Sequence, residues 1–133
     1  MITGKRYIEI VKDYFAFLKE EYNYTLIDEI IRGNAYYDVQ YTDNLKVVSI
    51  SYENIENYFQ VIVFILQNGK LPNYDDKTRT LHLNKLNTSV LSKIDKIEVL
   101  LNNEYFANFQ VKDEFERKLL KSAKELRLCL KHW

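Results

Sequence analysis

Residues 36–66, YYDVQYTDNLKVVSISYENIENYFQVIVFIL, decide the fold. The first two segments of this stretch alternate with a period of two, which is typical of β-strands because neighbouring side chains point to opposite faces. The alternating apolar and aromatic residues are Tyr37, Val39, Tyr41, Val48, Ile50 and Tyr52. The third segment, 58–66, is apolar on both faces, as in a strand that is covered on both sides or is central in a sheet. The short connections at 42–44 and 53–57 predict antiparallel neighbours.

The chain before this stretch predicts one weaker strand and a helix. Thr25–Arg32 has the composition of a strand, but its alternation breaks at Asp28 and Glu29, which indicates a bulge or a sheet edge. Gly33 and Asn34 predict the turn that follows it. Residues 5–22 predict an amphipathic helix that ends at Asn23, because apolar residues recur at steps of three and four. That apolar stripe consists of Ile8, Val11, Phe15, Leu18 and Tyr22.

The chain after the stretch is predicted to be mainly helical. Residues 68–76 contain the only proline and read as a loop, and residues 77–87 fit either a short strand or an ordered loop. A helix is then expected with Val90, Ile94, Ile97 and Leu101 on one face. Asp113 and Glu116 resemble a capping box, which starts a last helix. The residues expected to face inward on that helix are Phe115, Leu119, Ala123, Leu126 and Leu130.

These patterns together predict the fold class. We expect an α+β protein with an N-terminal helix, a three- to four-stranded antiparallel β-meander and C-terminal helices packed on the sheet. The 133 residues are the length of about one domain, so residues 1–133 are expected to form a single α+β domain.

Charge and composition narrow the classes of partner. The 19 basic and 19 acidic residues cancel, so strong non-specific attraction to nucleic acid or to an acidic membrane is not expected. The distribution is uneven, since residues 1–60 have a balance of −4 and residues 112–132 have a balance of +3. The longest apolar run, 61–66, is too short to span a bilayer, and the first residues do not resemble a signal peptide. A cytoplasmic protein without a membrane partner is expected, and its oligomeric state stays open.

The residues that carry chemistry are few and scattered. His82 and His132 lie far apart, Cys129 is the single cysteine, and no metal-binding spacing is present, so neither a metal nor another cofactor is expected. One alternative remains a small enzyme or ligand-binding domain that uses the loop at Asp75 and Asp76 together with His82. Another is a nucleic-acid-binding accessory protein that uses the last helix. The basic residues of that helix are Lys112, Arg117, Lys118, Lys121, Lys124, Arg127 and Lys131.

The order of segments also resembles a known family. The helix that contains YFAFLKEEY (14–22) precedes YYDVQY (36–41), VVSISYE (47–53) and FQVIVFI (59–65), with further helices after them. Over roughly residues 10–70 this is similar to the small immunity proteins encoded beside bacterial polymorphic or contact-dependent toxins. The resemblance implies a non-catalytic cytoplasmic protein that binds one cognate toxin domain and blocks its active site or substrate surface.

A candidate binding patch follows from the strand pattern. Many such toxins are nucleases with basic surfaces, and an acidic inhibitor surface would speed their association. Tyrosine is also enriched at interface hot spots. We therefore expect the open face or edge of the sheet to bind the partner through a mixed tyrosine and acid patch. Its members are Tyr36, Asp38, Gln40, Glu53, Glu56 and Tyr58.

Overall fold

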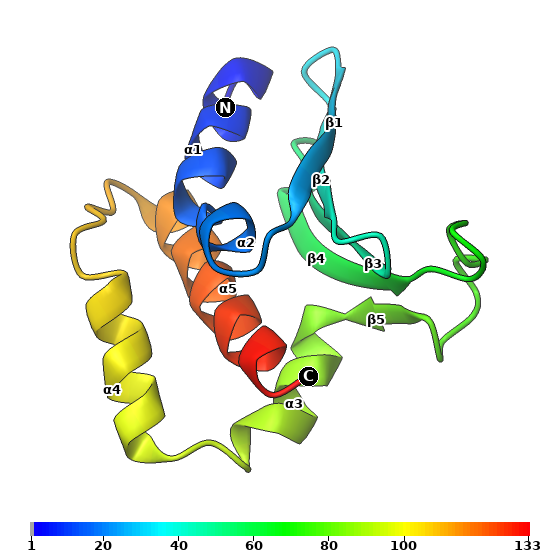
Figure 1. The fold of residues 1–133 in the computed structure, drawn as a ribbon. Helices are drawn as coiled ribbons and strands as arrows, with labels where there is room; N and C mark the ends of the chain where they lie inside the picture. The colour runs from blue at the N-terminus through cyan, green and yellow to red at the C-terminus, as the bar shows by residue number, and fades with distance from the viewer. Residues whose placement is uncertain (1) are drawn as a thin grey trace. The chain divides into compact units, whose positions relative to one another are not determined.

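The computed structural model describes residues 2–133, which divide into two compact units. The first unit ends at His82 and contains two helices and the whole sheet, whereas the second begins at Leu83 and contains three helices (Figure 1). The helix–sheet–helix order confirms the predicted α+β class.

The sheet is antiparallel and its strands follow one another in chain order, β1-β2-β3-β4-β5. Sequence alternation located four of these strands. The fifth resolves the ambiguity at residues 77–87, because a short strand there pairs with β4. The bounds are β1 Thr25–Arg32, β2 Tyr36–Thr42, β3 Lys46–Glu53, β4 Tyr58–Ile65 and β5 Thr80–His82.

Strand β1 forms one edge of the sheet. Its register against β2 shifts between Leu26 and Asp28, which is the bulge that the broken alternation predicted. Gly33 in the next turn has a φ of 56°, a left-handed conformation that glycine adopts without strain. The turns before β3 and β4 use Asn44 and Asn57 in the same region, which asparagine tolerates better than most residues.

The N-terminal helix differs from the prediction because it is interrupted. Helix α1 covers Gly4–Tyr14 and a short helix α2 covers Phe17–Glu20, where one continuous helix over 5–22 was expected. Phe15 and Phe17 are both buried and their ring centroids are 6.0 Å apart. In a continuous helix these two side chains would point in nearly opposite directions. The break at Phe15 therefore allows both rings to enter the core. Asn23, with a φ of 57°, ends the helical segment as expected.

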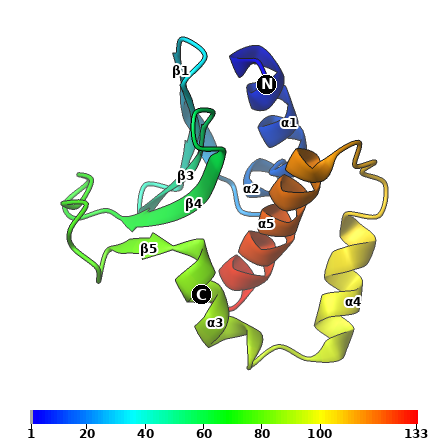
Figure 2. The ribbon, with the colours of Figure 1, turned by 180° about the vertical axis from the view of Figure 1, so that it is seen from behind.

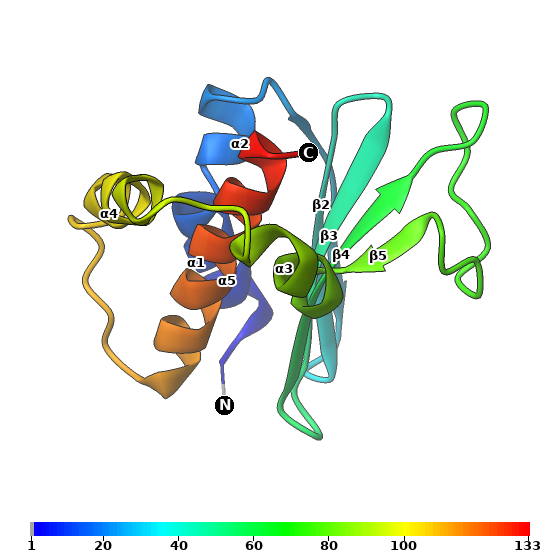
Figure 3. The same ribbon diagram turned by 90° about the horizontal axis from the view of Figure 1, so that it is seen from below.

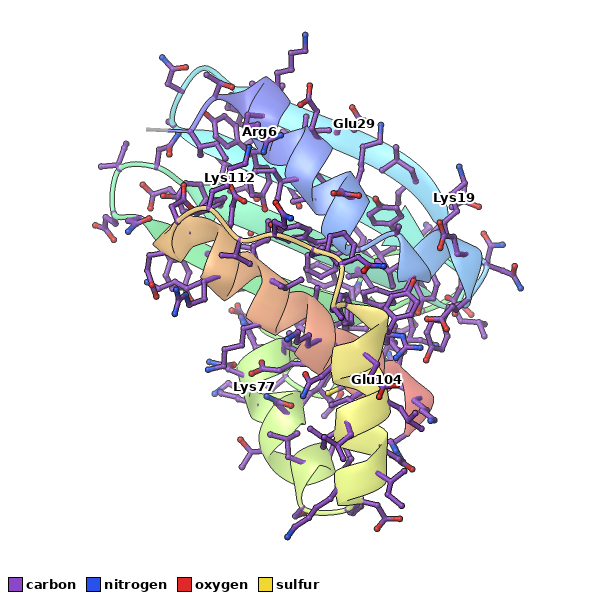
Figure 4. All side chains as sticks on the ribbon, turned by 90° about the vertical axis from the view of Figure 1, so that its left-hand side faces the viewer. Arg6, Lys19, Glu29, Lys77, Glu104 and Lys112 are labelled. Atoms are coloured by element: carbon purple, nitrogen blue, oxygen red, sulfur yellow. The ribbon has the colours of Figure 1, made fainter. Side chains whose placement is uncertain are left out.

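Helices α1 and α2 lie on one face of the sheet (Figure 3). The buried Tyr7 hydroxyl donates a 2.7 Å hydrogen bond to the carbonyl oxygen of Ile50, and its ring lies beside Tyr37 and Tyr52. Gly4 permits this close approach, because an added Cβ would stand 2.9 Å from Cγ2 of Ile31. Figure 4 shows Glu29 beside α1, where it accepts a 2.9 Å bond from Lys12.

The second unit contains α3 Leu83–Leu91, α4 Lys96–Tyr105 and α5 Glu114–Lys131. Helix α5 lies between α3 and α4 (Figures 1 and 2). Asp113 caps the last helix as expected, since it accepts a 2.9 Å bond from the amide of Glu116, whereas the Glu116 carboxylate accepts from the amide of Lys112, one residue before the cap. Four of the five residues expected inward on α5 are buried, and Phe115 is half-buried.

The helix predicted through Val90 and Leu101 is wrong as a single element. The chain leaves the helical conformation between Leu91 and Lys96, so the expected stripe is divided between α3 and α4. Ile97 and Leu101 are exposed and Val90 and Ile94 are half-buried, so the four residues predicted on one helix face do not form one buried surface. Among residues 2–133, no helix has both the length and the apolar character needed to cross a membrane.

Candidate protein-binding face of the sheet

Five of the six predicted patch residues share one face of the sheet. Tyr37 and Tyr52 pack against α1, so the residues that alternate with them on β2 and β3 point away from that helix. The antiparallel register places Tyr36 opposite Glu53, and Glu53 opposite Tyr58. This row crosses three strands at one end of the sheet. We call the polar face the set of Tyr36, Asp38, Gln40, Ser49, Ser51, Glu53, Tyr58 and Gln60.

Asp38 lies near the centre of the polar face and is only 3% exposed. Its Oδ1 accepts a 2.7 Å hydrogen bond from the Ser49 hydroxyl, and its Oδ2 accepts a 2.8 Å bond from the Gln40 amide. Burial raises the pKa of Asp38, and these hydrogen bonds offset the shift only in part. Nearby Asp28 raises it further. The carboxylate is therefore held by neutral donors in a site that disfavours its charge.

Tyr36 and Tyr58 also belong to the polar face, and they differ in how exposed their side chains are. The Tyr36 ring is half-buried, and the guanidinium carbon of Arg32 stands 5.4 Å above its centroid. Burial and the neighbouring Asp38 raise the pKa of the Tyr36 hydroxyl, which therefore stays protonated at neutral pH. Tyr58 is largely exposed. The end row thus presents one fixed and one accessible phenol ring on either side of Glu53.

Glu56, the sixth predicted residue, is in the turn between β3 and β4 and not on the sheet itself. Its backbone amide donates a 3.3 Å bond to the Glu53 carboxylate, which ties the turn to the end row. Asn54 fixes the turn from the other side, because its amide group donates to the Asn34 carbonyl at 2.6 Å and to the Tyr37 hydroxyl at 2.9 Å. Both acids are therefore held at the same end of the sheet.

Ile55 is a surface residue outside the predicted patch. It lies at the tip of the same turn and is 78% exposed. Most isolated surface hydrophobics need no explanation. Ile55 differs because hydrogen bonds of Asn54 and Glu56 hold its turn, so the side chain is presented in a defined place. The sequence could have indicated Ile55, because it is the one apolar residue in a four-residue turn.

Asp38→Asn is expected to stabilise the protein at neutral pH. The raised pKa means that the folded protein keeps the Asp38 proton to a higher pH than the unfolded chain does. The free energy of unfolding therefore falls as pH rises from the ordinary aspartate pKa, about 3.9, through the raised value. Without this titration, the variant should exceed the wild type by about 0.5–2 kcal/mol at pH 7. The difference should shrink toward acid pH in urea unfolding curves, and a variant less stable than the wild type at pH 7 would contradict this reading.

The loop at Asp75 and Asp76, which was the predicted site of the alternative enzyme function, is held by local hydrogen bonds. Asp76 accepts bonds from the Thr78 amide at 3.0 Å and from its hydroxyl at 2.6 Å, and these bonds lower the pKa of Asp76. His82 packs edge-on against Tyr74, with ring centroids 6.0 Å apart. In the part of the chain that the structure describes, His82 forms no hydrogen bond or ion pair with Asp75 or Asp76. No group of three or more His, Cys, Asp or Glu side chains among residues 2–133 is placed to hold a metal ion.

The basic last helix is partly engaged in contacts of its own unit. Arg117 pairs with Glu114 at 3.6 Å, and Lys121 pairs with Glu125 at 3.9 Å. Arg127 donates a 2.8 Å bond to the Asn102 side-chain oxygen. Glu114 and Glu125 therefore offset part of the positive charge of the helix, and the Arg127 guanidinium is held by a contact within its own unit.

Cys129 is buried in the second unit, where burial and, to a smaller extent, Glu125 raise its pKa to about 11. A thiol with this pKa is almost fully protonated at neutral pH and is a poor nucleophile. His132, three residues later, pairs with Glu98 and so has a different partner. This arrangement does not favour thiolate chemistry.

No protein-family model, no curated protein and no solved structure matches this chain.

Proposed function

We propose that this protein is a non-catalytic binding module, an immunity protein that neutralises a cognate bacterial toxin domain in the cytoplasm. The observation that supports the proposal best is the convergence of Tyr36, Glu53 and Tyr58 in one row across three strands. Tyrosine rings give large contact area for little loss of conformational entropy, and tyrosine is enriched among interface hot spots. The row therefore has the composition of a protein-binding surface.

Asp38 also supports a binding function, because its buried charge lowers the stability of the fold. Burial disfavours its charge, and its side-chain donors Ser49, Gln40 and Tyr36 are all neutral. A residue that lowers stability in this way is often retained because it serves a function. In a complex, a lysine or arginine of the partner placed over the polar face would compensate the charge. The favourable interaction between Asp38 and this cation would form only in the complex.

The turn supplies the apolar part of the proposed interface. Ile55 is 78% exposed and lies between Glu53 and Glu56 in the sequence, so the turn combines an exposed apolar residue with two nearby acidic residues. Such a tip fits a concave apolar site with a cationic rim, as at the substrate surface of a nuclease. Because hydrogen bonds already fix the turn, little conformational entropy would be lost when it docks.

The proposal is tested with the toxin domain encoded by the neighbouring gene. Isothermal titration of the purified chain into that domain should give a one-to-one complex with a dissociation constant on the order of nanomolar. The same stoichiometric amount should abolish the activity of the toxin domain. Absence of binding heat together with undiminished toxin activity would contradict the proposed function.

A further inference from the structure

Helix α4 exposes its large aliphatic residues and buries a single polar residue, Asn102. Ile97, Leu100 and Leu101 are 69%, 62% and 54% exposed, although they lie on one face at spacings of three and four residues. Glu104 continues the same stripe one turn later (Figure 4). Asn102, in contrast, is only 2% exposed. This is the reverse of the usual arrangement in a surface helix.

Specific polar contacts with α5 fix the orientation of α4. The Asn102 side chain donates a 3.0 Å bond to the carbonyl oxygen of Lys124 and accepts a 2.8 Å bond from Arg127. The Arg127 guanidinium also stacks 4.0 Å from the Tyr105 ring centroid, and Glu98 pairs with His132. Rotating α4 to bury its leucines would break all of these contacts. The contacts between α4 and α5 therefore keep the apolar stripe exposed.

The charges around the stripe differ between its two ends. The N-terminal end carries Lys93 and Lys96 with one acid, Asp95, whereas Glu104 lies at the C-terminal end. Glu98 faces His132 and is already paired. Two copies of α4 packed in parallel would place like charges together. Antiparallel packing would place Lys96 of one copy at the end where Glu104 of the other lies, and it also opposes the helix dipoles.

We propose that two copies of this chain associate through α4, in an antiparallel two-fold arrangement that buries Ile97, Leu100 and Leu101. A two-fold axis near Leu100 makes this stripe self-complementary, since each copy offers the same apolar centre and opposite charges at its ends. The contact area is that of a single helix face, which is below the size of a standard stable interface. The dimer therefore forms with a dissociation constant in the micromolar range.

Sedimentation velocity of the full chain over a wide range of concentration tests the proposal. The mass should rise from 16.0 kDa toward twice that value as concentration increases. Leu100→Glu should raise the dimer dissociation constant by about tenfold or more. Leu45→Glu is the matched control, because Leu45 is comparably exposed in the other unit and should leave association unchanged. Circular dichroism checks that both variants are folded.

The charge pattern gives a second and independent readout. Lys96→Glu and Glu104→Lys should each weaken the dimer, and the double exchange should restore it. A protein that stays monomeric at every concentration would overturn the proposal, as would a dimer that Leu100→Glu leaves intact. Neither result bears on the polar face, which lies in the other unit.

Discussion

Tyr7→Ala is expected to lower the free energy of unfolding by about 3–5 kcal/mol, because it removes a fully buried aromatic ring. Tyr7 is 0% exposed, and its ring centroid is 5.5 Å from that of Tyr37 and 6.0 Å from that of Tyr52. Its hydroxyl bonds to the carbonyl of Ile50 in the middle of β3. A loss of this size approaches the whole stability of many small proteins. Urea unfolding followed by circular dichroism would measure it.

Tyr7→Phe distinguishes the contribution of the hydrogen bond to stability from that of the buried ring. This variant keeps the packing and loses only the bond to Ile50, so it should cost about 1 kcal/mol. If the two substitutions cost the same, α1 would be held to the sheet mainly by that bond, and the packing account would be wrong. If neither had an effect, α1 would not lie against the sheet through Tyr7.

Removing the acids of the proposed interface should weaken toxin binding by about a hundredfold, or roughly 3 kcal/mol. The variant combines Asp38→Asn, Glu53→Gln and Glu56→Gln, which keep side-chain size and most hydrogen-bonding atoms. The loss follows because partner cations would then lack their carboxylates, and those facing Asp38 would be left partly buried. Calorimetric titration against the toxin domain gives the affinity, and stopped-flow mixing shows how much of the loss comes from slower association.

A second triple variant controls for net charge. Glu9→Gln, Asp13→Asn and Glu20→Gln remove the same number of carboxylates from exposed positions on or next to α1 and α2. This variant loses the same long-range attraction but keeps the polar face, so its affinity should stay within a few-fold of the wild type. Equal losses in the two variants would mean that net charge, and not the polar face, governs binding.

Sequence alternation predicted the sheet well, because a period of two fixes which side chains share a face. It located β2 and β3 to within a residue or two, and the register of Tyr36, Glu53 and Tyr58 follows once the short turns make the strands antiparallel. The same rule brought five of the six patch residues onto one face. The residues that share a face of an antiparallel meander can therefore be predicted from the sequence when the turns are short.

The helices were harder to predict, because tertiary contacts override helical periodicity. The break at Phe15 depends on two rings that both enter the core, which a helical stripe does not describe. In α4, the bonds of Asn102 and Arg127 turn the apolar stripe outward. Nothing in the local pattern shows that an asparagine will have two good partners on α5. The burial of Asp38 likewise involves a neighbour on another strand, since Ser49 of β3 donates to its carboxylate.

The most direct test of the central claim is a map of amide hydrogen exchange in the chain with and without its toxin domain. Binding through the polar face predicts added protection at residues 36–40 and 53–60, with α4 unchanged. Protection confined to the second unit, or to the loop at 68–79, would contradict the claim that this face of the sheet binds the toxin.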